Sequence, residues 1–253
     1  MSMKKRALQI ALFLAVMLLT FYALFSGRDL SEIGRALMGM SFWYLIPSIT
    51  LAVFFVCAEG FMIWYLLRSM KAQKEGYKAS SLPRCIQYSF IGFFYSGITP
   101  SATGGQPVQL YYMNKDGNRG SDSTVVLMTV AVAYKFVLVV MGLGILLFWM
   151  NPLRQELGNY FPLYLLGLAL NVILVILILG VMLFPKVILK LALLFEGLFI
   201  RLKIWKPSEK REEKINGFID SYQQAVTWLK DHKGSLLVVI FVTFLQRCSV
   251  FVL

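Results

Sequence analysis

The sequence predicts an all-α polytopic membrane protein, with about five transmembrane helices and a re-entrant, broken helical hairpin. The chain has 253 residues, of which 58% are hydrophobic and 15% are charged, whereas soluble domains average about 25% charged residues. The apolar residues gather into runs of about 20, the length that a helix needs to cross a bilayer. Lys and Arg number 25 against 13 Asp and Glu, and nearly all lie between these runs. A soluble globular fold is therefore disfavoured.

Five apolar runs fit the length of a transmembrane helix. They cover residues 7–25, 43–67, 123–150, 161–184 and 235–253. The first run is too long for the apolar part of a secretory signal, so we expect an uncleaved span. The last run is still apolar at Leu253, so we expect a fragment truncated at its C-terminus, with residues 1–253 forming one membrane domain.

Residues 85–113 do not fit this template. The apolar arm before Pro100 and the shorter arm that ends at Met113 would measure about 22 Å and 13 Å as helices, at about 1.5 Å per residue. Neither arm crosses a hydrocarbon core of about 30 Å alone. The stretch therefore either crosses the membrane once as a broken helix, or enters and returns as a re-entrant hairpin.

The distribution of cations decides between these topologies, because they put every later loop on opposite sides. A hairpin places 20 of the 25 Lys and Arg on the side of the N-terminus and leaves Arg28, Arg35 and Arg154 opposite. A single crossing would leave nine on the N-terminal side and 14 on the other. The positive-inside rule thus favours the hairpin and a cytoplasmic N-terminus.

Two stretches have the pattern of helices that lie at a membrane surface. Residues 27–40 alternate charged and apolar positions at helical spacing, which suits a short helix on the outer surface. Residues 185–234 form a cytoplasmic amphipathic region, and apolar residues recur at three- and four-residue steps in its second half, after a predicted cap near Ser208.

The segment from Pro100 to Pro107 is the most informative for function. Pro100 ends the first arm because it has no N–H donor, and the spacing of Thr103 and Gln106 predicts a capping box that starts the second arm. The two glycines between them permit a tight turn, and a proline is tolerated in the first turn of a helix. The structural residues of this predicted motif are Pro100, Ser101 and Pro107.

This turn would aim a helix N-terminus into the membrane, where its N–H groups and positive dipole end favour an anion. The abundant anion of a bilayer is a lipid phosphate. Its candidate ligands are Thr103, Gly104, Gly105, Gln106 and Lys135. A packed kink that binds no ligand is the alternative, and the sequence leaves both open.

Charged residues inside spans are costly and usually face a cavity or each other. Glu59 and Lys135 lie at similar depths from one face, so a pair across helices is allowed, although either side chain could instead extend towards an interface. The candidate intramembrane partners are Glu59, Gln109 and Arg247. We expect no metal site and no His-based catalytic site, because His232 is the only histidine and the three cysteines form no CxxC pair.

The stretch from Ile98 to Tyr112 (ITPSATGGQPVQLYY), followed by a basic turn and a span with a central cation, resembles the membrane domain of lysylphosphatidylglycerol synthases and their stand-alone flippase-like relatives. The resemblance extends over the whole chain. Several versions of the motif carry an acidic residue after Gly-Gly and an arginine further along, where this chain has Gln106 and Gln109.

The resemblance implies translocation of aminoacylated phosphatidylglycerol, or a related anionic lipid, between the leaflets of a bacterial cell membrane, in support of resistance to cationic antimicrobial peptides. The expected partner is phosphatidylglycerol or its lysyl form, with no cofactor, no catalytic residue in this chain and no nucleic acid unless a further transferase domain binds tRNA. Lysyl transfer to phosphatidylglycerol and a role as membrane partner of a separate transferase are the alternatives. Homo-oligomerisation is left open.

Overall fold

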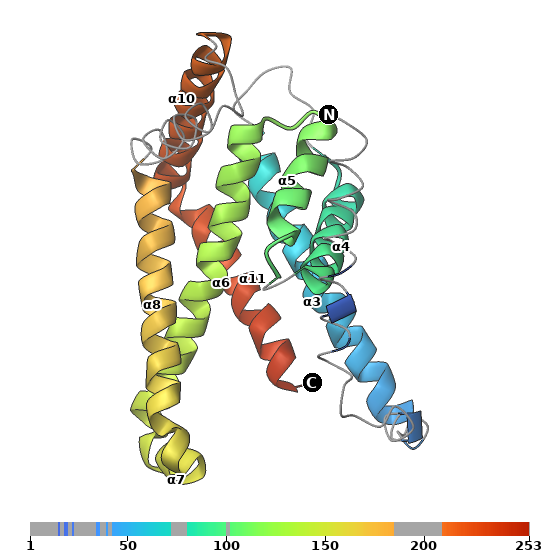
Figure 1. Ribbon diagram of the computed structural model, residues 1–253, viewed down its shortest axis with the longest axis vertical. Helices are drawn as coiled ribbons and strands as arrows, with labels where there is room; N and C mark the ends of the chain where they lie inside the picture. Colours follow the sequence, from blue (N-terminus) through green and yellow to red (C-terminus); the bar gives the residue numbers. More distant parts are fainter. Residues whose placement is uncertain are drawn as a thin grey trace.

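The structure, a computed structural model, describes residues 42–71, 80–99, 102–184 and 209–252, with seven isolated positions before residue 42. Within these ranges the chain forms helices and no strand (Figure 1). The elements are α3 (Phe42–Lys71), α4 (Leu82–Ile98), α5 (Gly105–Lys115), α6 (Gly120–Phe148), α7 (Met150–Leu157), the 3₁₀ helix η2 (Gly158–Tyr160), α8 (Phe161–Leu183), α10 (Glu209–Asp231) and α11 (Lys233–Val252). The predicted all-α class is confirmed.

Four helical stretches are long and apolar enough to cross a membrane: Phe42–Met70, Gly120–Phe148, Met150–Leu183 and Lys233–Phe251. They coincide with four of the five apolar runs in the sequence, and the third joins α7, η2 and α8. The chain is a multi-pass membrane protein. The predicted span at 7–25 and the predicted surface helix at 27–40 lie outside the continuously described residues, as does the region 185–208.

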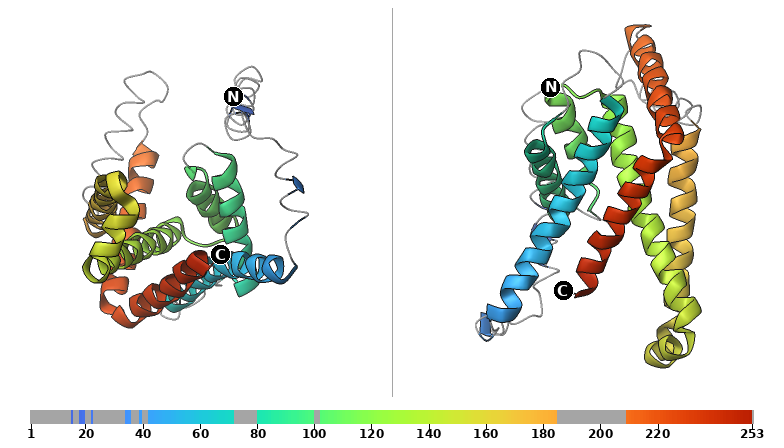
Figure 2. Two further views of the ribbon diagram at one scale, coloured as in Figure 1. Left: turned by 90° about the horizontal axis from the view of Figure 1, so that it is seen from below. Right: turned by 180° about the vertical axis from the view of Figure 1, so that it is seen from behind.

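Helix α6 is the centre of the bundle. It packs against α8 on one side and against α3, α5 and α11 on the other, while α10 lies against its N-terminal half. Figure 2 shows α11 running beside α3 and crossing towards α6. Most side chains on the outer faces of the spans are apolar and exposed, for example Leu166 and Ile176 of α8, as expected of helices that contact lipid.

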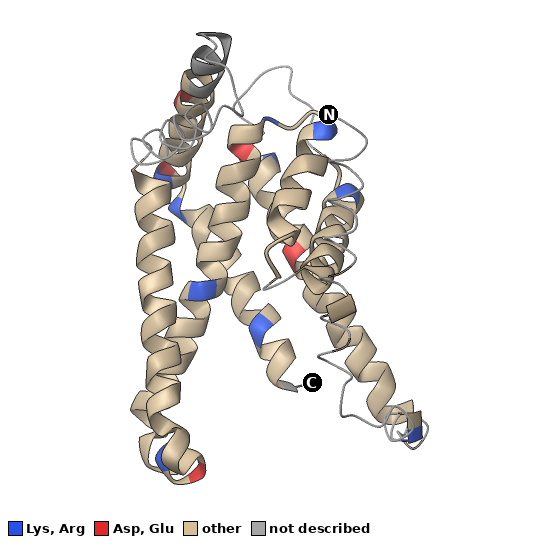
Figure 3. Cartoon of the chain, viewed as in Figure 1, with Lys and Arg blue, Asp and Glu red and all other residues tan. Residues whose placement is uncertain are grey.

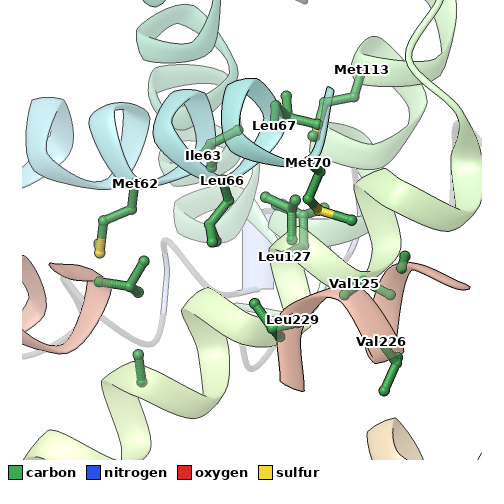
Figure 4. Close-up of a cluster of buried hydrophobic side chains, with 14 of the residues drawn as sticks. Met62, Ile63, Leu66, Leu67, Met70, Met113, Val125, Leu127, Val226 and Leu229 are labelled. Atoms are coloured by element: carbon green, nitrogen blue, oxygen red, sulfur yellow. The ribbon is translucent and has the colours of Figure 1, made fainter. Parts of the chain in front are cut away.

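The buried core lies towards the end of the bundle where α3, α5, α6 and α10 meet (Figure 4). Helix α3 contributes a stripe of fully buried side chains at helical spacing, including Ile63 and Leu66 at 0% exposure and Leu67 at 1%. Met113 of α5 and Val125 of α6, both also 0% exposed, pack into the same cluster. The amphipathic helix predicted after Ser208 is α10, and its apolar face joins this core.

Helices α4 and α5 form an antiparallel hairpin whose two outer ends meet (Figure 1). Arg84, in the first turn of α4, donates from Nε to Oδ2 of Asp116 at 2.5 Å and from Nη2 to Oδ1 at 3.1 Å. The Tyr88 hydroxyl donates to the same carboxylate. Asp116 directly follows the end of α5, so the start of α4 and the end of α5 lie at the same end of the bundle. This is the geometry of a hairpin and not of a single helix that crosses the membrane.

Close packing joins the hairpin to α3. A Cβ atom at Gly60 of α3 would lie 2.6 Å from the Cα of Ile86 in α4. Small residues allow such close approach of helix backbones, which strengthens packing where lipid provides no hydrophobic driving force.

Neutralising Asp116 should destabilise the hairpin in a pH-dependent way. The Arg84 guanidinium holds the pKa of the Asp116 carboxyl below its ordinary value of 3.8. The ion pair therefore stabilises the folded protein fully at pH values above this ordinary pKa, and its contribution is lost as the pH falls through the lowered pKa. Asp116→Asn should cost about 0.2–1 kcal/mol at neutral pH, since the ion pair is partly exposed. The check is thermal unfolding of the purified protein from pH 8 down to pH 3.

The difference between Asp116→Asn and wild type should be constant from pH 8 to 5 and should shrink below pH 4. Asp220→Asn, a neutralisation at an exposed position of α10, serves as the control and should leave the unfolding temperature unchanged. An Asp116→Asn protein as stable as wild type at pH 7 would contradict the assigned role of this ion pair.

Candidate functional site

The turn between α4 and α5 is built around Thr99. Its hydroxyl donates to the carbonyl of Tyr95 at 2.6 Å and accepts the backbone N–H of Gly104 at 2.9 Å. A Cβ atom at Gly104 would lie 2.5 Å from Cγ2 of Thr99, so the turn requires glycine there. Ala102 has a φ of 56°, a left-handed conformation that is strained for residues with a side chain.

The predicted capping box of Thr103 and Gln106 is wrong. Helix α5 begins at Gly105, and its N-cap is Gly104, which has no side chain to cap with. The backbone N–H of Gly104 donates to the hydroxyl of Thr99, five residues earlier. A side chain at the end of α4 therefore stabilises the turn. Pro107 lies in the first turn of α5. Pro100 and Ser101 lie outside the described residues.

A cavity of about 500 Å³ opens beside this turn, between the hairpin and helices α3, α6, α8 and α11. Six of the residues singled out in the sequence line it: Glu59, Gly105, Gln106, Gln109, Lys135 and Arg247. Thr103, Gly104 and Pro107 are not among its lining residues. The structure thus brings together candidates from four helices that are up to 188 positions apart in the chain.

Glu59 of α3 is held by Gln109 of α5. The Gln109 side chain, 2% exposed, donates from Nε2 to Oε1 of Glu59 at 2.7 Å. Gly92 of α4 makes this contact possible, because a Cβ there would lie 2.2 Å from Gln109 Nε2 and 2.5 Å from its Cδ. The hydrogen bond therefore reaches across the hairpin only because α4 has no side chain at this position.

The start of α5 packs equally closely on α4. A Cβ at Gly105 would lie 2.1 Å from Oγ of Ser96 and 2.7 Å from the carbonyl oxygen of Gly92. The first N–H groups of a helix have no partner within it. Gly105 and Gln106 both line the cavity, so this helix start borders it.

Lys135 of α6 is bound by a residue that the sequence analysis missed. Its Nζ donates to Oδ1 of Asn171 in α8 at 3.1 Å, and Asn171 Nδ2 donates in turn to the carbonyl of Gly167 at 2.8 Å. The direct pair of Glu59 and Lys135 that the sequence allowed is not formed. Asn171 is the one amide or charged side chain in the run 161–184, and that isolation was the signal that could have identified it.

Arg247 of α11 lies between two aromatic rings. Its guanidinium carbon is 3.6 Å from the ring centroid of Tyr134 and 4.7 Å from that of Phe55. Such stacking on desolvated aromatic faces stabilises a cation by about 2 kcal/mol. Nε of Arg247 is buried and has no hydrogen-bond partner. A buried guanidinium nitrogen without an acceptor is a costly arrangement, and an anionic ligand would satisfy it.

The three charged side chains of the cavity sum to an excess of one positive charge. Lys135 and Arg247 are cations, Glu59 is the carboxylate, and Glu59 and Arg247 interact electrostatically without forming a direct ion pair. Figure 3 shows that charged positions are frequent near the ends of the bundle and few at its middle. In a low-dielectric interior an unbalanced cation attracts a single anionic group strongly, so the cavity is suited to a monoanion such as a phosphodiester.

Placing a methyl group at Gly92 should displace Gln109 from Glu59. Gly92→Ala overfills the contact between α4 and α5, and such overpacking costs about 1–3 kcal/mol. The control is Gly97→Ala on the same helix, where a Cβ meets nothing within 4 Å; it should be neutral or slightly stabilising, because alanine favours helix by about 1 kcal/mol. Thermal unfolding of both variants in detergent is the measurement, and equal stability would refute the packing argument.

Comparison with known proteins agrees with this architecture. A family described as the lysylphosphatidylglycerol synthase TM region matches residues 6–253. Searches of curated proteins and of solved structures gave no match. Because the matched region covers almost the whole chain, the protein belongs to the lysylphosphatidylglycerol synthase transmembrane-region family.

Proposed function

We propose that this chain translocates an anionic phospholipid between the two leaflets, and that the cavity beside the α4–α5 turn binds the phosphate of its headgroup. The observation that carries this proposal is Arg247, a half-buried residue of a membrane helix that lines the cavity and whose Nε is buried without a hydrogen-bond partner. A charge at this depth costs several kcal/mol on insertion, and a phosphate is the abundant membrane group that offsets it.

The ligand set proposed for the phosphate comes from three sides of the cavity. Arg247 of α11 and Lys135 of α6 supply positive charge, and Gly105 and Gln106 supply the N-terminal end of α5. Helix N-termini and arginine both suit phosphate oxygens, through N–H groups and the forked geometry of the guanidinium. Glu59, held by Gln109, stands opposite as the one carboxylate and suits an amine on the same headgroup.

The lipid class in this proposal rests on the family description. The family is described as the lysylphosphatidylglycerol synthase TM region, and we therefore propose phosphatidylglycerol or its lysyl form as the cargo. Lysylphosphatidylglycerol carries one phosphate and two amines, so it is a net cation; in the proposed pose Arg247 and Lys135 contact its phosphate and Glu59 contacts one of its amines. Its appearance in the outer leaflet would lower the negative surface charge and so weaken the binding of cationic antimicrobial peptides.

The proposed orientation follows from the cations. Arg84, Lys115 and Arg119 lie at the end of the bundle where the hairpin begins and ends, and Arg154 lies on α7 at the opposite end. Placing the cation-rich end in the cytoplasm satisfies the positive-inside rule. The chain would then lie in the bacterial cell membrane with its N-terminus in the cytoplasm.

Removing either cation of the cavity should abolish translocation. Arg247→Gln and Lys135→Gln, each reconstituted in vesicles with a fluorescent phosphatidylglycerol or its lysyl form, should reduce the rate at which inner-leaflet lipid becomes accessible to a membrane-impermeant quencher. A drop of about tenfold or more is expected, because the loss of a charged hydrogen-bond partner costs about 1.5–3 kcal/mol. Arg247→Lys should retain part of the activity, since it keeps the charge but not the fork.

The matched control is Arg154→Gln, which removes an exposed cation of α7 far from the cavity and should translocate at the wild-type rate. Thermal unfolding of each variant separates loss of function from loss of fold. Wild-type rates in Arg247→Gln and Lys135→Gln together would overturn the proposal.

Lysyl transfer is the second candidate, and the family description is what favours it. Incubation of the purified chain with lysyl-tRNA and phosphatidylglycerol tests it directly. Formation of lysylphosphatidylglycerol that survives Arg247→Gln would favour transfer chemistry over translocation.

A further inference from the structure

A second cavity lies on the other side of α6. It measures about 210 Å³ and lies between α6, α8, α10 and α11, which converge at one end of the bundle (Figure 1). Its floor is buried and apolar, with Ala133 and Met182 at 5% and 4% exposure and Val239 at 1%. Thr129 also lines it, but its hydroxyl donates to the carbonyl of Val125 at 2.7 Å, so it needs no partner from the cavity.

Such a space does not hold water. A buried water needs two to four polar partners, and apolar cavities of this size stay dry and take up apolar ligands. The natural source of an apolar ligand here is the bilayer. Phe136 of α6 and Leu183 of α8 line the cavity and are 42% and 37% exposed, so the cavity is bordered by side chains on the outer surface of two membrane spans.

The polar end of the ligand is indicated by Lys230. Among the described residues that line the cavity it is the charged one, and it lies near the end of α10, three residues before α11 begins at Lys233. A lysine at this level can place its alkyl chain along apolar surface and its ammonium group at the interface. The distance from Thr129 to Phe136 along α6 is about 10 Å at about 1.5 Å per residue, which accommodates part of an acyl chain.

We propose that this cavity binds the acyl chain of an anionic phospholipid, with Lys230 paired to its phosphate. The site is separate from the headgroup cavity, because the two use different faces of α6: Ala131, Tyr134 and Lys135 line one, and Ala133 and Phe136 line the other. The bound lipid is therefore a resident ligand that fills the space between α8, α10 and α11, and it is distinct from the translocated lipid.

Photo-crosslinking tests this site independently of transport. The full chain in nanodiscs is irradiated with phosphatidylglycerol that carries a diazirine in one acyl chain, and the adducts are mapped by mass spectrometry. Adducts are expected on the peptides that contain residues 129–136 and 179–183. Ala133→Phe, which fills the cavity from α6, should remove these adducts. Ala169→Phe, which adds the same ring at an exposed position of α8, should leave them unchanged.

Lys230 is tested by changing the headgroup. Lys230→Gln should lower the labelling by phosphatidylglycerol about fivefold, the effect of one lysine near an anionic lipid, and should not alter labelling by the matching phosphatidylcholine probe. Lys233→Gln is the control for charge removal nearby. Leu179→Trp, which fills the cavity from α8, replaces Ala133→Phe if that variant fails to fold by thermal unfolding and gel filtration.

Equal labelling of Ala133→Phe and Ala169→Phe would overturn the proposal, as would adducts confined to the exposed face of α8. Equal loss of both probes in Lys230→Gln would overturn the pairing with phosphate. Photo-crosslinking reports whether lipid occupies the cavity, whereas the vesicle assay reports translocation. Either result can therefore be negative while the other is positive.

Discussion

The hydrogen bond from Gln109 to Glu59 is the contact on which the rest of the site depends. It joins α5 to α3 across the thickness of α4, at a donor–acceptor distance of 2.7 Å, and it exists because Gly92 leaves room for the glutamine. Without it, a carboxylate inside the membrane would lack its hydrogen-bond donor, and the inner half of the hairpin would lose this polar attachment to α3. With it, the start of α5 is fixed where it faces the cavity.

The charged residues of the cavity are stabilised by separate devices that leave a net positive charge. Glu59 uses an amide donor, Lys135 uses the amide oxygen of Asn171, and Arg247 uses two aromatic faces. A direct ion pair between Glu59 and either cation would have neutralised the pair. Neutral or quadrupolar partners stabilise each charge without cancelling it, so the two cations remain available to the phosphate that we propose as ligand.

Sequence reasoning succeeded where one strong physical constraint acts and failed where several weak ones compete. The long apolar runs predicted the helical class, and the shortness of both arms of residues 85–113 predicted the paired helices α4 and α5. The capping box failed because the N-cap of α5 is Gly104 and not Thr103, and the Thr99 hydroxyl at the end of α4 accepts the N–H of Gly104. The roles of Gly92 and Asn171 depend on which helices are neighbours, and that information is not in the local pattern.

The position of α6 explains how one helix can serve two unlike cavities. Residues 127, 130, 131, 134 and 135 line the charged cavity, and residues 129, 132, 133 and 136 line the apolar one. Both sets recur at steps of three and four, and they are offset by two residues, about 200° around a helix of 3.6 residues per turn. The two cavities therefore lie on opposite faces of α6. One helix thus forms a wall of both the proposed headgroup site and the proposed acyl-chain site, and its two faces keep them apart.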